Sequence, residues 1–381
     1  MKTSHFDYII IGNGLAGLQL ALKMVSDSFF SKKKIILIDP VSKINNDKTW
    51  SFWEKQTSNW DNITQRNWSQ AEVITSNKKI NLNLQPYSYK TIRAIDFYSH
   101  AKNVLKKVKN INFIIDSVVS ILNDNDTVIV KTKNNKIYSA NHVFDSRIPE
   151  SFKKNKTHIH IRQHFKGWLI KSKTEVFNEH KITMMDYRLK DGNQTTFMYV
   201  LPFSKDQALI EFTYFNEHLV EEIVYDTFIK TYIRDYLKID QYHIIEKEKG
   251  QIPMTNFPFE QHNSKIITKI GTGGGWVKGS TGYSFKHTEK KVIKIINNLK
   301  ANKKPSVGLF RSKYKFYDKI FLKVLKDNNS MGEWIFEQFY SKNSVETMFR
   351  FLDEESSLIE ELKIMWSLLS WSFVKAFFKT L

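Results

Sequence analysis

The stretch DYIIIGNGLAGLQLALKMVSDSFFSKKKIILID, residues 7–39, decides the fold. A short β-branched run leads directly into the glycine pattern Gly12-x-Gly14-x-x-Gly17, and a second apolar run ends in Asp39. In such a unit the first glycine permits a tight turn, the second lets the backbone approach a pyrophosphate, and the third allows close packing of helix on strand. An acid about 20 residues further on binds a ribose hydroxyl. The spacing therefore predicts a strand–helix–strand unit that binds a dinucleotide.

The composition excludes several kinds of site. The 381 residues include no cysteine, so disulfides, thiolate nucleophiles and thiolate metal sites are absent. Lys and Arg number 58 against 39 Asp and Glu, and the net charge of +19 favours an anionic surface. No nucleic-acid-binding motif accompanies the charge, so we expect a membrane surface or simply solvated lysine-rich faces. His158 and His160 share a strand face without a third ligand, and we expect no metal site.

The two ends of the sequence bear on targeting. Residues 1–30 lack the ordered pattern of a secretory signal, so we expect none. The most apolar segment, 365–378, has 14 residues and includes Lys375, which is short of the ~20 residues that a membrane-spanning helix needs. Because Trp366 and Trp371 lie in this segment, two interpretations have equal weight: a helix lying in a membrane interface, or a terminal helix docked on the core.

The fold class is α/β, with four expected regions. Residues 1–150 give the first part of a Rossmann-type domain, and 151–255 read as an inserted antiparallel sheet. Residues 256–300 return to the nucleotide domain, and 301–381 show helical spacing. Shorter features are also predicted: helices near 96–108 and 217–237, a hairpin of 118–122 and 127–131 turning at 123–126, a strand at 266–270, and capping boxes at Asn343-x-x-Glu346 and Ser357-x-x-Glu360.

Glycine returns far downstream in IGTGGGWVKGSTGYSF, residues 270–285. In flavoproteins of the two-part type, a late strand and glycine loop close over the flavin and lead into a helix. We expect Gly271, Gly275 and Gly282 to approach the cofactor, with the helix starting at 279–282. A flexible loop before a surface helix is the alternative.

A series of motifs in order resembles the bacterial lycopene β-cyclases. The motifs are GNGLAGLQLA, DKTWSFW (47–53), FDSR (144–147), QHFKGW (163–168), MDYR (185–188), FMYVLPFS and ALIEFTYF (197–215), GQIPMT (250–255), GGGWVKGSTGYSF (273–285) and FRFLDEE (349–355). The resemblance runs from residue 7 to about 360. It implies an FAD-containing enzyme whose reduced flavin serves without net redox change. Such enzymes close β-ionone rings on lycopene, giving γ-carotene and then β-carotene.

The resemblance also implies a catalytic acid. Glu211 matches the family's catalytic glutamate, although a single Glu in a strand most often faces solvent. Some members carry Asp at the next position, where this sequence has Phe212. A carboxyl group kept protonated by burial would protonate the terminal double bond. We expect Trp50, Trp53, Phe212 and Tyr283 to line the substrate pocket, although a buried aromatic cluster explains Trp50 and Trp53 almost as well.

Further expectations concern cofactor and partners. Asp145 follows an apolar pair and is expected near the cofactor, together with Gly12, Gly14, Gly17 and Asp39. NADPH is the expected reductant. Lycopene, cyclic carotenoids, the inner face of the cell membrane and other carotenoid-pathway enzymes are the expected partners of a cytoplasmic, peripheral enzyme. The alternatives are an FAD-dependent monooxygenase or halogenase, and a flavin-containing polyene-binding protein without turnover.

Overall fold

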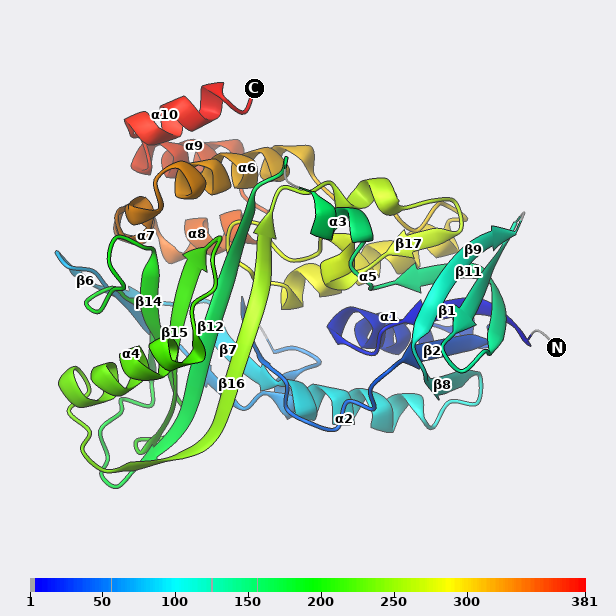
Figure 1. The fold of residues 1–381 in the computed structure, drawn as a ribbon, viewed down its shortest axis with the longest axis horizontal. Helices are drawn as coiled ribbons and strands as arrows, with labels where there is room; N and C mark the ends of the chain where they lie inside the picture. Colours follow the sequence, from blue (N-terminus) through cyan, green and yellow to red (C-terminus); the bar gives the residue numbers. More distant parts are fainter. Residues whose placement is uncertain (1–3, 56, 125, 156) are drawn as a thin grey trace.

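The computed structural model describes residues 4–55, 57–124, 126–155 and 157–381. Within these residues, the chain forms a nucleotide-binding sheet and a larger antiparallel sheet at opposite ends of an elongated molecule (Figure 1). The nucleotide-binding sheet contains β1 (Ser4–Ile11), β2 (Ile35–Asp39), β8 (Ile111–Ile115), β9 (Val118–Asp124), β10 (Thr127–Thr132), β11 (Ile137–Asp145) and β17 (Ile267–Lys269). Its order β8-β2-β1-β11-β10-β9, with β17 beside β11, confirms the Rossmann-type expectation.

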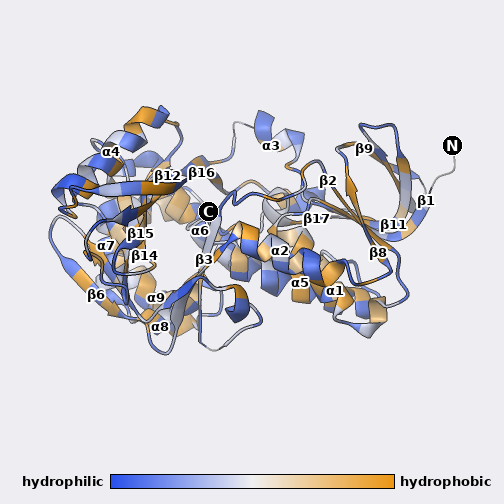
Figure 2. Cartoon of the chain, turned by 90° about the horizontal axis from the view of Figure 1, so that it is seen from below, coloured by the Kyte–Doolittle hydropathy of each residue, from blue (hydrophilic) through white to orange (hydrophobic). Residues whose placement is uncertain are grey.

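Strand β1 is the centre of this sheet and pairs in parallel with both β2 and β11. Its last four residues are buried, as expected of a strand covered on both faces. Helix α1 (Leu15–Val25) packs against α2 (Ala94–Leu105) and α5 (Phe285–Lys300), and Figure 2 shows these helices together. The second glycine-rich segment therefore does bring its helix back to the first unit.

The second sheet has the order β16-β12-β15-β14-β13-β5-β6. Its strands are β16 (Tyr242–Thr255), β12 (His160–Ser172), β15 (Gln207–Asn216), β14 (Thr196–Pro202), β13 (Lys181–Asp186), β5 (Gln70–Ile74) and β6 (Lys79–Asn83). Strands β5 and β6 come from the first 150 residues, and β5 pairs in parallel with β13. The expected boundary at residue 150 therefore does not separate the two sheets.

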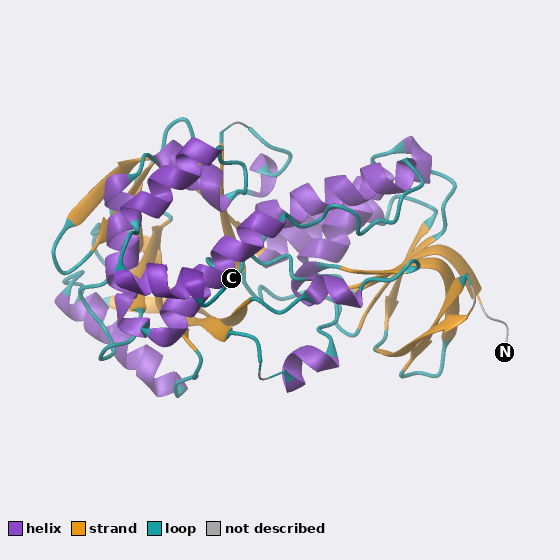
Figure 3. Ribbon diagram, turned by 90° about the horizontal axis from the view of Figure 1, so that it is seen from above, coloured by secondary structure: helices purple, strands orange, loops and turns teal. Residues whose placement is uncertain are grey.

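Helices cover both faces of the second sheet. Helix α4 (Glu222–Asp235) packs on β12 and β15 from one side. The C-terminal helices gather on the other side, where their apolar residues share one core with β5, β13 and β14 (Figure 3). These helices are α6 (Ser312–Asp327), α7 (Gly332–Lys342), α8 (Val345–Leu352), α9 (Leu358–Ser367) and α10 (Trp371–Phe378). A short helix, α3 (Glu150–Lys154), precedes β12.

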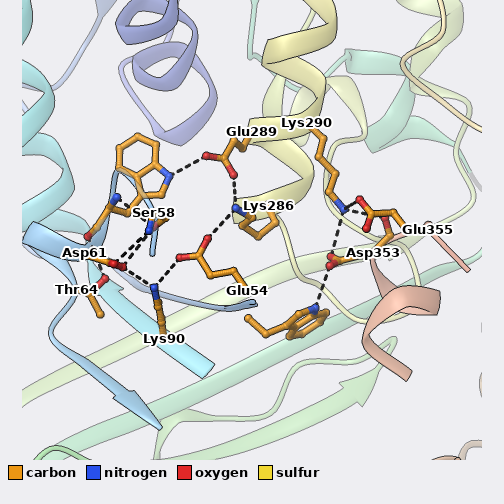
Figure 4. A network of polar contacts seen from close by, with 12 residues as sticks. Glu54, Ser58, Asp61, Thr64, Lys90, Lys286, Glu289, Lys290, Asp353 and Glu355 are labelled. Atoms are coloured by element: carbon orange, nitrogen blue, oxygen red, sulfur yellow. Dashed lines mark hydrogen bonds and ion pairs between the residues drawn. The ribbon is translucent and has the colours of Figure 1, made fainter. Parts of the chain in front are cut away.

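A three-stranded sheet of β3 (Thr49–Glu54), β7 (Ser88–Arg93) and β4 (Arg66–Trp68) lies between the two main sheets. A polar network fastens it to α5 (Figure 4). Lys90 Nζ donates to Glu54 at 2.9 Å, and Lys286 Nζ donates to the other oxygen of Glu54 at 3.1 Å. Both lysines are largely buried, and each also pairs with a second acid, Asp61 for Lys90 and Glu289 for Lys286, so the network ties β3 to α5.

Several local expectations can now be compared with the structure. The hairpin of β9 and β10, the helices and the Ser357–Glu360 capping box are confirmed, although Asn125 of the expected turn lies outside the described residues. The Asn343 cap is wrong: Ser344 caps α8 and accepts from Thr347 N. The helix expected at 279–282 begins only at Phe285, because the backbone turns through a positive φ at Gly282.

Candidate functional site

A cavity of about 770 Å³ connects the two sheets and the C-terminal helices. Its lining includes Gly14 and Gly271 from the two glycine segments, Glu211 of β15, and Phe373 and Phe377 of α10. Tyrosine and phenylalanine rings make up much of the middle wall: Tyr89, Phe165, Phe197, Tyr199, Phe215, Tyr283, Phe336, Phe339 and Tyr340. The site is thus a long, largely apolar passage with a glycine loop at one end.

The glycine loop has the form of a phosphate cradle. Gly14 caps α1 without a side-chain hydrogen bond, and a Cβ built on it would meet nothing within 4 Å. In contrast, a Cβ on Gly17 would lie 2.0 Å from Gly12 O. Gly12 has φ +102°, and a Cβ there would clash with Ser146 Oγ. Gly12 and Gly17 therefore shape the turn, while Gly14 leaves open space before a helix N-terminus, which fits a dinucleotide pyrophosphate.

Asp39 stabilises this loop through hydrogen bonds to backbone N–H groups. Its Oδ2 accepts from Asn13 N at 2.7 Å, and its Oδ1 accepts from Val41 N at 2.8 Å. The residue is buried and does not line the cavity. In the structure its carboxylate orders the loop, and contact with a ribose stays a prediction.

The second glycine segment supplies part of the same wall. Gly271 (φ +59°) lines the cavity, and a Cβ on it would lie 3.1 Å from Ala16 Cβ, so the two glycine segments touch. Gly282 also lines the cavity, against Gln163. The expectation for Gly275 is wrong, because its Cα faces Phe259 outside this cavity.

The expectation for Asp145 also needs correction. Its two carboxylate oxygens lie 2.9 Å from Arg147 Nε and Lys269 Nζ, and the neighbouring Ser146 lines the cavity in its place. Burial opposes ionisation here, but hydrogen bonds and the charges of Arg147 and Lys269 hold the pKa of Asp145 below its ordinary value. Asp145 thus joins β11 to β17 and supports the cofactor end indirectly.

Glu211 lies on β15 with its side chain toward the cavity and is only 6% exposed. Thr213, two residues along the same face, donates from Oγ1 to Glu211 Oε1 at 2.6 Å. Burial and, to a smaller extent, the charge of Glu248 raise the pKa of Glu211 to about 8, while the Thr213 hydrogen bond opposes the shift. At neutral pH the carboxyl group is therefore mostly protonated, as a proton donor requires.

Phenol groups surround this carboxyl group. Tyr199 faces Glu211 in the register of β14 and β15. The Tyr89 hydroxyl lies 2.8 Å from that of Tyr199 and 3.0 Å from that of Tyr283, and Tyr199 donates to Ser51 Oγ. Burial raises the pKa of all three phenols, so they stay neutral and present aromatic faces that can stabilise a cation.

Of the four expected pocket residues, Trp50 and Tyr283 line the cavity. Trp53 does not: it stacks on Phe349 at 4.4 Å between ring centroids, and its Nε1 donates to Asp353. The prediction that Phe212 lines the pocket is wrong as well, because successive residues of a strand point to opposite faces and Glu211 takes the cavity face. Its ring stacks on Phe228 of α4, within the core on the far side of the sheet.

Exposed apolar side chains gather at the other end of the cavity. Met365, Leu369, Phe377 and Phe378 line the cavity and are also exposed to the outside, so the cavity opens between α9 and α10. Further exposed apolar residues on these two helices and just after α10 are Leu358, Ile359, Leu362, Trp366, Trp371 and Leu381. We call these ten residues the apolar mouth. Lys363, Lys375 and Lys379 are exposed beside it.

Over the described ranges, no three His, Asp or Glu side chains come together as a metal ion would need. Among the helices that the structure describes, none combines the length and the apolarity required to cross a bilayer.

The family profile described as "Lycopene cyclase protein" matches residues 7–380. The chain belongs to the lycopene cyclase family. The match covers the glycine loop, the Glu211 strand and both helices of the apolar mouth, so the whole cavity is built from family sequence. No curated protein matches the sequence of this family member.

Solved structures similar to this cyclase family member are flavoproteins. A geranylgeranyl bacteriochlorophyll reductase-like protein from Thermoplasma acidophilum has a TM-score of 0.63 at 12% identity, covering 100% of both chains. The flavin-dependent brominase Bmp2 has a TM-score of 0.63 at 12% identity, covering 92% of this chain and 94% of its own. The halogenase PltM, in complex with phloroglucinol and FAD, has a TM-score of 0.55 at 11% identity, covering 91% and 78%. At such identities the similarity establishes the fold alone.

Sequence reasoning missed several residues of the family member's site. Tyr89 and Tyr199 lie on strands far apart in the chain, and no local pattern joins them. Glu248 was missed because it alternates with exposed residues in β16, a pattern typical of a solvated edge strand. Glu248 lies two strands from Glu211, so the two acids could have been related only once the strand order was known.

Proposed function

We propose that this protein is a lycopene β-cyclase that uses reduced FAD without net redox change. One observation carries the proposal: a buried carboxyl group, Glu211, stands in the wall of an apolar cavity whose far end is a dinucleotide cradle. The residues of this one cavity could thus bring a long hydrocarbon, Glu211 and a bound dinucleotide together. The family membership and the flavoprotein fold both support this assignment.

The chain's own residues account for most of the proposed chemistry. The protonated Glu211 carboxyl gives its proton to the terminal double bond of lycopene, which forms a tertiary carbocation. The next double bond attacks this cation and closes the ring, and loss of one proton from the ring restores a double bond. One proton is added and one is lost, so the product is an isomer. Tyr199 and Tyr283 offer aromatic faces to the cation and exclude water.

FAD fits the residues at the opposite end. Gly14 and the N-terminus of α1 would hold the pyrophosphate, while Ser146, Gly271 and Thr272 line the space beyond. When bound, reduced flavin would supply negative charge that favours a cationic transition state. NADPH is the proposed reductant, needed only to prime the flavin.

The apolar mouth supports a lipid location for the substrate. Lycopene and its cyclic products dissolve in lipid, and an exposed apolar patch flanked by lysines suits an anionic bilayer surface. We therefore propose peripheral attachment to the cytoplasmic face of the cell membrane, where other carotenoid-pathway enzymes would supply lycopene.

Expression in a lycopene-accumulating bacterium, followed by pigment chromatography, tests the function. A cyclase converts lycopene to γ- and β-carotene, and the purified enzyme needs reductant only in an amount stoichiometric with flavin. A monooxygenase or halogenase would consume oxygen and NADPH in step with product. A polyene-binding protein would leave the retention time and spectrum of lycopene unchanged, and that result would refute the proposal.

A further inference from the structure

A second, half-buried acid faces Glu211 across a single glycine. In the sheet, Glu211 of β15 is in register with Gly167 of β12, and Gly167 is in register with Glu248 of β16. In-register residues of neighbouring strands lie on the same face, so both carboxyl groups point to the same side with no side chain between them. A Cβ built on Gly167 would lie 3.4 Å from both Glu211 Cβ and Glu248 Cγ.

The surroundings of the two acids differ. Thr49 Oγ1 donates to Glu248 Oε2 at 2.8 Å, and the charge of Arg93 also favours the ionised form of Glu248, whereas the charge of Glu246, with which Arg93 pairs, opposes it. Burial still raises the pKa of Glu248, to about 7. Around Glu211 the facing groups are neutral: Thr213 and the phenols of Tyr199 and Tyr283. The Thr49 hydrogen bond and the charge of Arg93 thus favour the ionised form of Glu248 against burial and the charge of Glu246, whereas at Glu211 the opposing contribution is the Thr213 hydrogen bond.

We propose that Glu248 is a positioning residue that acts through Glu211: the two carboxyl groups share a proton across Gly167, and the charge left on Glu248 keeps that proton on Glu211. The physical reason is that two neighbouring carboxylates in an apolar setting resist being ionised together. This inference rests on the proposed cyclase function. It makes Glu211 available as an acid at a pH where an isolated carboxyl group would be ionised.

The pH profile of cyclisation tests the inference. Glu248→Gln keeps the shape of the side chain and an acceptor for Thr49 but removes the charge, so Glu211 should ionise at lower pH. On the basic limb of the profile the rate should fall about tenfold relative to the wild type, while the acidic plateau is retained. Glu248→Asp keeps the charge and should leave the basic limb near that of the wild type. The matched control is Glu222→Gln, a 61% exposed acid of α4 on the opposite face of the sheet.

A spectroscopic readout separates this role from a structural one. The infrared carbonyl band of the protonated Glu211, assigned by its loss in Glu211→Gln, should disappear at lower pH in Glu248→Gln than in the wild type. Equal loss of rate at every pH, with the band unmoved, would overturn the inference. If Glu248→Gln does not fold, Glu248→Asp carries the test. A basic limb of Glu248→Asp that is displaced to lower pH relative to the wild type, although the charge is kept, would also overturn the inference. Failure of the wild type to cyclise lycopene would instead refute the proposed function.

Discussion

Glu211 and Phe212 are consecutive in β15, yet Glu211 faces the cavity and Phe212 faces α4. The alternation is regular: Leu209 and Phe215 share the core of the cavity side, while Ile210 and Phe212 belong to the core beneath α4. One strand therefore supplies a cavity-lining surface and a packing surface at once. Substitutions at adjacent positions should consequently have different effects.

Glu211→Gln should abolish cyclisation and leave the fold intact. The amide keeps the volume of the side chain but has no acidic proton, and loss of a general acid typically lowers the rate by ~10²–10⁴-fold. Pigment chromatography of a lycopene-producing strain should show unchanged lycopene, while the purified variant still binds FAD as judged by absorbance. Normal β-carotene from this variant would end the assignment of Glu211.

Phe212→Ala should lower the free energy of unfolding. The ring is fully buried and stacks on Phe228 at 4.4 Å, so its removal leaves a cavity beneath α4. Such truncations cost about 3–5 kcal/mol of unfolding free energy. Urea unfolding followed by fluorescence would measure this loss. A variant of wild-type stability with impaired cyclisation would return Phe212 to the substrate pocket.

The stability of the wild type should depend on pH through Glu211. Its pKa is about 8 in the folded protein against 4.5 for an ordinary glutamate, so between these values the folded state holds a proton that the unfolded state has released. Unfolding free energy then falls as pH rises through this window, by roughly 3 kcal/mol between about pH 5 and pH 8, and levels off above the folded pKa.

Glu211→Gln supplies the comparison for this dependence. The amide does not titrate, so the stability difference in favour of Glu211→Gln should widen from about pH 5 to pH 8. Melting temperatures of both proteins across this range test the expectation. A constant difference would show that Glu211 is ionised in the folded protein.

The sequence predicted the fold where local patterns are strong. The glycine loop, Asp39 and the alternating strands each depend on neighbours within a few residues, and the structure confirms the elements they form. Strand order is different, because it depends on pairing between distant segments. Strands β5 and β6 join a sheet more than 100 residues away in the chain, so the expected boundary at residue 150 did not hold.

The same limit applies to the site. Glu211 and Tyr283 were predicted from motifs of the family, and Phe212 and Trp53 were wrong because a motif does not say which face of a strand each member occupies. Trp53 satisfies its indole N–H with Asp353, a partner 300 residues away. Glu248 and Glu211 lie on either side of Gly167 on the same face of the sheet. This relationship could be predicted only from the register of three strands.

Membrane binding should depend on the apolar mouth. Trp366 and Trp371 are 79% and 78% exposed, so replacing them by Ser should change stability by no more than about 0.5 kcal/mol. Partition to vesicles containing phosphatidylglycerol should fall about tenfold for each tryptophan removed. Raising the salt concentration should weaken binding of the wild type, because the lysine contribution is screened. The control is Ile223→Ser, which replaces an exposed apolar residue of α4. Equal binding by all variants would place the membrane contact elsewhere.

Gly14→Val should remove FAD binding without unfolding the protein. A Cβ on Gly14 meets nothing within 4 Å, so the valine side chain can be accommodated by the chain itself, but it would occupy the space before α1 that a pyrophosphate needs. Gly17→Val is the informative contrast, since its Cβ would collide with Gly12 O and disturb the loop. Flavin absorbance after gel filtration and the melting temperature together distinguish the two outcomes. We expect Gly14→Val to melt close to the wild-type apoprotein with no bound flavin, and Gly17→Val to lose stability as well. Full flavin content in Gly14→Val would place the pyrophosphate outside this cradle.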